Sequence, residues 1–274
     1  MDDQEGESQV KSVRKAVDVL DALASARRPL RIGEISARLG MSQSAVSRII
    51  ATLAKVEMVY QDEESGRCHL GLGLAVLGAK SLGRRNIDRI ALPIMDEIAA
   101  RTGFYVGLGR LSRGSVVIMR SLPTPLAQRD VTLTVVAPIH ACAPGKILVG
   151  GMSDTAVVEL LSTYGMDPIT ANTITEPERF LAVVDAARQN GFAVDTEEAG
   201  HDYMHFAVPI MDHNSDIVAS LSAGGTLSEF RKNNIPTLLS ALNYGALRIS
   251  RELDYPGEIP LKIEALGAEM ATPG

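Results

Sequence analysis

The chain has 274 residues, a length that suits two domains, and its composition of 46% hydrophobic and 22% charged residues excludes a wholly disordered protein. It contains no tryptophan and only 4% aromatic residues, which argues against a protein that stacks single-stranded bases. No apolar run is long enough for a transmembrane helix and the N-terminus is acidic, so we expect a cytoplasmic protein without a membrane partner.

The net charge of −6 argues against nucleic acid binding only if the charge is evenly spread, and it is not. Residues 11–55 contain nine lysines and arginines against three acidic residues, whereas residues 1–10 contain four acidic residues. Attraction to phosphate decays over a Debye length of roughly 8–10 Å, so the local charge matters more than the total. Charge alone is compatible with a solvated surface as well as with DNA binding. Residues 1–11 are predicted to be a disordered acidic tail.

Residues 12–70 are predicted to form a winged helix-turn-helix domain. Gly40 can adopt the left-handed conformation that ends a helix, and Ser42 is a good N-cap for the next one. Short helices followed by a hairpin are typical of DNA binding, although a protein-binding helical domain could pack in the same way. The predicted elements are helices over 12–25, 33–39 and 43–55 and strands over 57–62 and 67–70.

The helix over 43–55 carries the functional prediction. Its apolar residues form one stripe, so the opposite face is small, polar and basic. Such a face can enter the major groove of B-DNA, which is about 12 Å wide. An arginine in the hairpin could reach a phosphate or the minor groove. The predicted DNA-contacting residues are Gln43, Ser44, Ser47, Arg48, Lys55 and Arg67.

Residues 71–89 are predicted to be a helical linker, and Gly83 and Pro93 should interrupt the helical pattern that continues to residue 100. This segment could pack against a partner chain or form a core helix of one domain. Residues 90–254 alternate between extended and helical patterns, which indicates an α+β fold with an antiparallel sheet and flanking helices. Residues 255–274 should form a loose tail. Strands are predicted near 104–111, 115–120, 131–136, 192–196, 203–211 and 217–223, and helices near 145–162, 177–189 and 232–252.

Two enzyme-like patterns in the second domain are weak. The segment 143–146 is not a phosphate-binding loop, because residue 140 is not glycine and no Ser or Thr follows Lys146, which is expected to be solvated. Cys142 and His140 are too poorly supported to be a nucleophilic pair, since no orienting carboxylate is identifiable. Neither a catalytic set nor a cofactor fingerprint is present in the sequence.

A metal site is also weakly supported. His201 and His205 would share one face of an extended segment, but no third ligand lies at a suitable spacing. Cys68 and Cys142 fall in different predicted domains, which does not indicate a disulfide. No metal site and no cofactor are therefore predicted.

Residues 12–252 resemble the IclR family of transcriptional regulators through collinear motifs whose order and spacing make the match specific. The resemblance implies a winged helix joined by a helix to a GAF-like effector domain, with the recognition helix at 43–55. It also implies a homodimer or dimer of dimers, for which a pseudo-palindromic operator in double-stranded DNA is expected. The motifs are S-V-R-K-A-V-D-V-L (12–20), I-S-A-R-L-G-M-S-Q-S-A-V-S-R-I-I-A-T-L (35–53), A-P-G-K-I-L (143–148), N-G-F-A-V-D-T-E-E (190–198) and I-V-A-S-L-S-A-G-G (217–225).

The resemblance further implies a site for a small carboxylic acid. His205 stands where the family often has cysteine and Gly224 where a hydroxyl residue is frequent, and the lost hydroxyl should open space. We therefore expect a bulkier or aromatic acid rather than glyoxylate or pyruvate. The alternative is that His205 simply fills the core. The predicted effector-binding residues are Ala143, Pro144, Gly145, Asp195, His205 and Ser222.

The sequence thus favours a ligand-responsive DNA-binding regulator over two other classes. An enzyme would need a nucleophile, base and acid at recognisable spacing, which the sequence lacks. A helical adaptor that binds only proteins would not retain a promoter duplex in a salt-dependent manner.

Overall fold

The chain divides into two compact units, Met1–Arg84 and Arg85–Gly274, each of which has its own core. The predicted acidic tail lies outside the described residues, apart from residues 10 and 11. The computed structural model describes residues 10–26, 28–82, 86–121 and 135–267.

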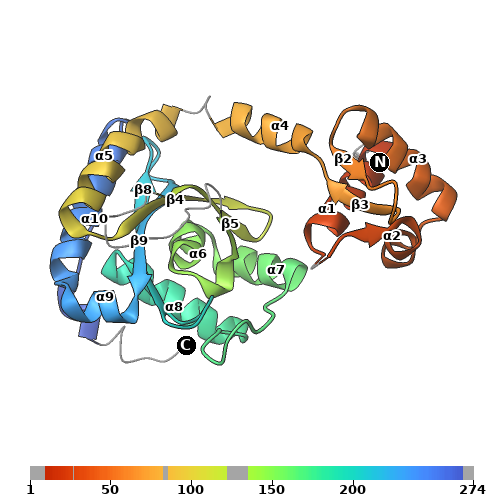
Figure 1. The fold of residues 1–274 in the computed structure, drawn as a ribbon. Helices are drawn as coiled ribbons and strands as arrows, with labels where there is room; N and C mark the ends of the chain where they lie inside the picture. The colour runs from red at the N-terminus through yellow and green to blue at the C-terminus, as the bar shows by residue number, and fades with distance from the viewer. Residues whose placement is uncertain (1–9, 27, 83–85, 122–134, 268–274) are drawn as a thin grey trace, which may run out of the picture. The chain divides into compact units, whose positions relative to one another are not determined.

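In the first unit, the described residues between 11 and 70 form three helices and a small antiparallel sheet of order β1-β3-β2 (Figure 1). The predicted helices are confirmed, and their apolar stripes form one core that includes Val19, Ile35, Val46 and Ile50. The two-residue strand β1 is too short to give a pattern in the sequence. The elements are α1 (Lys11–Ala24), β1 (Leu30–Arg31), α2 (Ile32–Leu39), α3 (Gln43–Lys55), β2 (Val59–Gln61) and β3 (Arg67–Leu70).

Both predicted signals between α2 and α3 are confirmed. Gly40 has φ 61° and ψ 29°, and its N–H donates to the Ser36 carbonyl at the end of α2. The Ser42 hydroxyl accepts a hydrogen bond of 3.3 Å from the Ala45 N–H and so caps α3. The turn between the two helices is therefore defined by local sequence.

Two further helices follow, α4 (Leu72–Leu82) and α5 (Asn86–Thr102). The expected interruption at Pro93 is wrong, because this proline lies inside α5. Gly83 lies outside the described residues. Ile87, Ala91, Met95 and Ile98 of α5 are buried in the core of the second unit. This apolar packing accounts for the continuity of the helix around a residue that cannot donate a backbone hydrogen bond.

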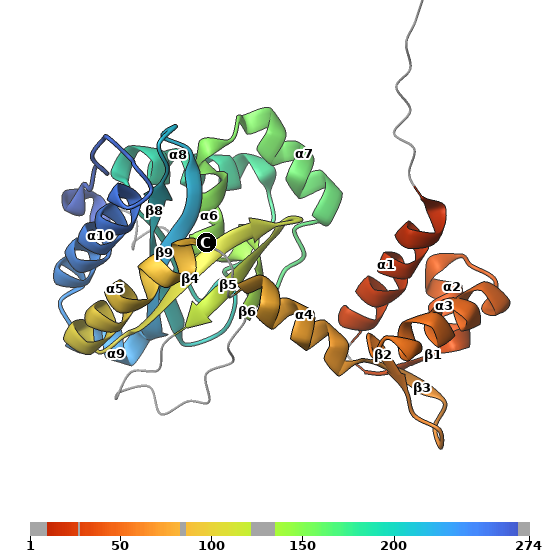
Figure 2. The ribbon, with the colours of Figure 1, turned by 90° about the horizontal axis from the view of Figure 1, so that it is seen from above.

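The second unit is built on a six-stranded antiparallel sheet of order β6-β5-β4-β9-β8-β7. Helices cover both faces of this sheet, α5 and α10 on one and α6 and α8 on the other (Figures 1 and 2). The strand predicted over 131–136 lies mostly outside the described residues, and the described strand is β6. The strands are β4 (Tyr105–Ser112), β5 (Ser115–Ser121), β6 (Val135–Pro138), β7 (Ala193–Thr196), β8 (Tyr203–Met211) and β9 (Ile217–Thr226).

One predicted helix of the second unit is split in the structure, and another is confirmed. The helix expected over 145–162 is broken by a 3₁₀ turn at Val149–Gly151, and Ser153 caps a new helix through the Ala156 N–H. The helix expected over 232–252 is confirmed, with bounds Ile235–Arg251, and a separate short helix precedes it. The helices are α6 (Ala143–Leu148), α7 (Asp154–Tyr164), α8 (Pro177–Asn190), α9 (Leu227–Lys232) and α10 (Ile235–Arg251).

The expectation of a loose tail is wrong for residues 255–267. Tyr255 and Ile259 are buried in the core with α5 and α10, and the Lys262 N–H donates to the Asn190 carbonyl at 2.9 Å. The proline and glycine residues of this segment exclude a long helix but leave its apolar side chains free to pack.

Candidate DNA-binding face and effector site

The polar face of α3 is accessible in the first unit. Val46, Ile50 and Leu53 are buried on the opposite side, as the helical period requires. The hydroxyls and the cations of this face can therefore approach a groove. Its exposed residues include all five predicted on this helix, namely Gln43, Ser44, Ser47, Arg48 and Lys55.

A hollow of about 490 Å³ lies between α1 and α3. Lys11 and Lys15 of α1 line it together with Arg48 of α3. Three cations of the basic N-terminal segment thus share one concave surface, which suits the anionic backbone of a nucleic acid.

Arg67, the sixth predicted DNA contact, is engaged within the unit. Its guanidinium donates to the Pro29 carbonyl at 2.7 Å and lies 3.8 Å from Glu34. Glu34 also accepts hydrogen bonds from the Arg28 guanidinium at 2.6 Å and from the Arg31 N–H at 2.7 Å. The hydrogen bond from Arg28, followed by that from Arg31, lowers the pKa of Glu34 to about 2. Two of the basic residues are therefore partly neutralised by this acid.

The second unit brings three predicted effector residues together on the α6 face of the sheet. The Asp195 carboxylate, on β7, is buried and accepts the Ala143 N–H at 2.9 Å. The register pairs Asp195 with His205 on β8, and His205 Nδ1 lies 3.2 Å from Asp195 Oδ1. His205 Nε2 is hydrogen-bonded to the Tyr105 hydroxyl from β4. Burial by itself lowers the pKa of His205, but the charge and hydrogen bond of Asp195 outweigh it and raise this pKa above its usual value.

Gly224 gives His205 the space that it occupies, so the expectation of open space at this glycine is wrong. The register places Gly224 opposite both Tyr105 and His205. A Cβ atom on Gly224 would lie 2.1 Å from His205 Cδ2 and 2.5 Å from the Tyr105 hydroxyl oxygen. The missing side chain is therefore filled by the protein's own rings.

The remaining predicted effector residues are also buried. Ser222 lies on the same strand as Gly224 and its hydroxyl donates to the Gly107 carbonyl at 3.2 Å. Pro144 is buried in the first turn of α6. A Cβ atom on Gly145 would lie 2.2 Å from the Ile139 carbonyl oxygen, so this glycine permits the close approach of two backbone segments.

Lys146 is not solvated, contrary to expectation. Its side chain is 1% exposed, and its ammonium donates to the Val194 carbonyl at 2.9 Å and to Glu198 at 2.5 Å. Burial raises the pKa of Glu198 to about 7, although the charge of Lys146 opposes this shift. The second carboxylate oxygen of Glu198 is buried and has no hydrogen-bond partner among the described residues. Sequence reasoning missed Glu198 and Tyr105, because only the register and the packing of α6 bring them to the site.

The structure also bears on the weaker chemical alternatives. His201 is exposed in the turn before β8, so it does not share a strand face with His205 as proposed. No group of three metal-ligating side chains occurs within the described residues. Burial, with a smaller contribution from Asp195, raises the pKa of Cys142 to about 12, which makes this thiol a poor nucleophile.

Two family models match the chain, and together they cover most of it. The IclR helix-turn-helix domain matches residues 12–63, and the bacterial transcriptional regulator IclR C-terminal domain matches residues 79–251. The chain belongs to the IclR family. This IclR protein is therefore a DNA-binding transcriptional regulator with an effector domain, and the family is one of regulators rather than enzymes. No described helix is both long and apolar enough to cross a membrane.

Relatives of known function and known structure match over almost the whole chain. The transcriptional regulator KdgR of Dickeya chrysanthemi is 32% identical over 247 residues, which cover 90% of this chain and 81% of KdgR. XynR of Escherichia coli (strain K12) is 28% identical over 248 residues, covering 90% of this chain and 98% of XynR. The IclR regulator of Alicyclobacillus acidocaldarius has a TM-score of 0.73 at 26% identity, covering 89% of this chain and 98% of that one.

One solved structure of the same fold contains a ligand. The IclR homolog of Microbacterium hydrocarbonoxydans was crystallised with 4-hydroxybenzoate, and it has a TM-score of 0.68 at 22% identity. The match covers 89% of this chain and 99% of that one. At this identity the likeness is one of fold.

Proposed function

We propose that this regulator reads a pseudo-palindromic operator with the exposed face of α3 and that a small aromatic carboxylic acid controls this binding. The ligand assignment rests on two rings, those of Tyr105 and Tyr203, which lie around His205. The His205 imidazole is itself held by the buried Asp195 carboxylate. The acid changes operator binding by having different affinities for two arrangements of the DNA-binding units.

The DNA-contacting role of α3 rests on its exposed polar face, where Arg48 lines the basic hollow together with Lys11 and Lys15. Arg48→Ala should weaken operator binding by about 1–3 kcal/mol if the side chain reads a base. Arg38→Ala is the matched control, because Arg38 is an exposed arginine of α2 outside the predicted face. Fluorescence anisotropy with a promoter duplex at several salt concentrations measures both variants. Equal binding by the Arg48 variant and the wild-type protein would exclude Arg48 as a contact.

Arg67 is assigned a supporting role in this proposal. Its guanidinium already bonds the Pro29 carbonyl and lies near Glu34, so it connects the hairpin to the start of α2. A phosphate contact through Arg67 would require the exchange of these internal partners.

The preference for an aromatic acid rests on three partly exposed rings. The rings of Tyr203 and His205 are nearly parallel, with centroids 6.4 Å apart and an interplanar angle of 15°. Tyr105 meets His205 edge-on at 5.8 Å. Aromatic ligands pack well in offset or edge-on arrangements with such rings. The Microbacterium homolog, which shares the fold, binds 4-hydroxybenzoate, in line with this preference.

The raised pKa of His205 adds a charge preference for an anion. An imidazolium next to the site attracts a carboxylate, and its charge persists to a higher pH than that of a free histidine. Affinity for the acid should therefore be retained up to the pKa of His205 and decline as the pH rises through it.

Isothermal titration of the full chain with 4-hydroxybenzoate, benzoate, glyoxylate and pyruvate tests this assignment. The aromatic acids should bind, and His205→Ala should weaken them by tenfold or more. His213→Ala is the matched control, because the His213 side chain is 66% exposed in the turn before β9. Binding of the two- and three-carbon acids alone, with both aromatic acids inert, would refute the size assignment.

Assembly as a homodimer or dimer of dimers is part of the same proposal. Leu72, Val76 and Leu77 of α4 are exposed apolar side chains on one short helix. Contiguous exposed apolar residues are typical of surfaces that another chain covers. Light scattering of Leu77→Glu should detect a smaller assembly than the wild type, whereas Ile169→Glu, at an exposed apolar position outside α4, provides the matched control.

A further inference from the structure

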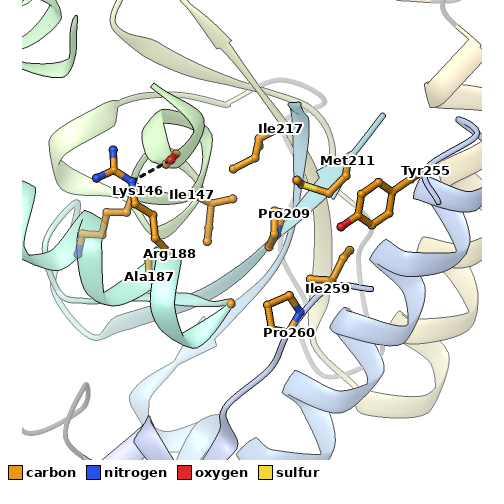
Figure 3. Close-up of a pocket in the computed structure, with 12 residues that line it drawn as sticks. Lys146, Ile147, Ala187, Arg188, Pro209, Met211, Ile217, Tyr255, Ile259 and Pro260 are labelled. Atoms are coloured by element: carbon orange, nitrogen blue, oxygen red, sulfur yellow. Dashed lines mark hydrogen bonds between the residues drawn. The ribbon is translucent and has the colours of Figure 1, made fainter. Parts of the chain in front are cut away.

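The second unit contains an apolar cavity whose wall includes the C-terminal end of β8 (Figure 3). Its volume is about 220 Å³. Pro209 lies four residues beyond His205 on the same strand face, which corresponds to about 13 Å along an extended strand. The lining side chains include Ile147 of α6, Ala187 of α8, Pro209 and Met211 of β8, Ile217 of β9 and Ile259 after α10.

The polar side chains in the wall of this cavity are already hydrogen-bonded within the protein. Arg188 donates to the Gly150 carbonyl at 2.8 Å and to the Met152 carbonyl at 2.7 Å (Figure 3 shows the first of these bonds). The Lys146 ammonium bonds Glu198 and Val194, so only its stem remains for the wall. The Tyr255 hydroxyl donates to the Glu258 carbonyl at 3.1 Å.

From this lining we infer that the cavity binds a neutral single-ring aromatic molecule. An apolar cavity of about 150 Å³ can stay free of water and bind benzene, and a cavity of about 220 Å³ leaves room for a ring with a small substituent. Figure 3 shows Ile147 and Ile217 on one side of the space and Tyr255 and Ile259 on the other. A flat ring between these walls would replace water contacts with apolar contacts on both of its faces.

This cavity is less suited to a carboxylic acid than the site at His205 is. An ionised carboxylate would lose its water and would have to compete with the carbonyl and carboxylate oxygens that already accept hydrogen bonds from Arg188, Lys146 and Tyr255. The inference goes beyond the proposed function, because it assigns a second site to a different class of ligand. Both sites adjoin α6, since Ala143 bonds Asp195 and Ile147 lines the cavity.

Thermal unfolding of the full chain with toluene tests the assignment. Toluene at ten times its dissociation constant should raise the unfolding temperature by about 3–5 °C. Ala187→Leu places three extra carbon atoms in the cavity and should abolish this rise. Ala182→Leu makes the same change at an exposed position of the same helix and should preserve it. Met211→Phe fills the cavity from β8 and gives a second filled variant if Ala187→Leu does not fold.

The outcomes separate this inference from the effector proposal. His205→Ala should leave the effect of toluene intact. Ala187→Leu should leave the binding of benzoate unchanged. No stabilisation of the wild type by toluene would overturn the inference, as would stabilisation that survives both filled variants. Loss of the toluene effect in His205→Ala would place the molecule in the other site instead.

Discussion

The two units each contain an ion pair of nearly the same length in very different surroundings. In the first unit an Arg28 nitrogen lies 2.6 Å from a Glu34 oxygen, and the two side chains are 58% and 37% exposed. In the second unit the Lys146 nitrogen lies 2.5 Å from a Glu198 oxygen, and the side chains are 1% and 5% exposed. The pairs differ in access to water far more than in distance.

Because of this difference, the pKa values of the two carboxyl groups are shifted in opposite directions. Hydrogen bonds lower the pKa of the hydrated Glu34 to about 2, whereas burial raises the pKa of Glu198 to about 7 despite the adjacent lysine. An exposed pair therefore adds little to stability and is easily replaced. A buried pair is not a large gain in itself, but removing one partner leaves a charge without water or counterion.

The largest predicted effect is the loss of one partner from the buried pair. Lys146→Met should destabilise the second unit by about 3–5 kcal/mol at pH 8, because Glu198 then remains buried without its cation. Differential scanning calorimetry of the full chain measures this loss. Arg28→Met is the matched variant of the exposed pair and should have a much smaller effect.

A double variant distinguishes charge from packing in this experiment. Lys146→Met combined with Glu198→Gln removes both charges and should recover most of the lost stability. If the double variant is no more stable than Lys146→Met alone, the lysine stem contributes through packing rather than through its charge. If Arg28→Met costs as much as Lys146→Met, burial does not separate the two pairs.

The next largest effect concerns the space beside His205. Gly224→Ser should destabilise the second unit by about 1–3 kcal/mol, because the added atoms overlap His205 and Tyr105. Calorimetry measures the loss. Gly200→Ser is the control, since nothing lies within 4 Å of the position of its Cβ atom.

Removal of the imidazole tests the cause of this overlap. His205→Ala in the Gly224→Ser background should restore part of the stability. A double variant that is less stable than both single variants would show that the serine clashes with the Tyr105 hydroxyl rather than with the imidazole.

The sequence predicts the functional face of the first unit better than the effector site of the second unit. The face of α3 follows from a local period, so all five of its predicted residues are exposed. The effector site depends on register and burial, which the local sequence does not encode. Asp195 meets His205 only because β7 pairs with β8 in one register. Lysines are seldom buried, so the sequence predicts Lys146 in water, but the packing of α6 against the sheet overrides that tendency.

The pH dependence of stability should have opposite signs for the two carboxylates. Glu34 has a folded pKa of about 2, below its ordinary 4.5, so its contribution is present above pH 4.5 and is lost as the pH falls to 2. Glu198 has a folded pKa of about 7, above 4.5, so its contribution is present below pH 4.5 and is lost as the pH rises through 7.

The stability of the wild type and of each glutamine variant, measured as a function of pH, tests these two signs. The stability of the wild type relative to Glu198→Gln should fall between pH 4.5 and 7. Relative to Glu34→Gln it should rise between pH 2 and 4.5 and stay level above that range. Parallel slopes for the two variants would show that burial does not control the ionisation of Glu198.

The smallest predicted effect is that of Glu34→Gln near neutral pH. The exposed carboxylate interacts with Arg28 and Arg67 through water-accessible charges, and these are screened as ionic strength rises. The variant should therefore differ from the wild type in unfolding temperature at low salt and converge with it in 0.5–1 M NaCl, where the Debye length is only about 3–4 Å. Glu198→Gln should keep its difference under the same conditions, because salt does not enter the buried site. If the Glu34 difference instead survives high salt, its hydrogen bond to the Arg31 N–H must carry the effect, since glutamine replaces a charged acceptor with a weaker neutral one.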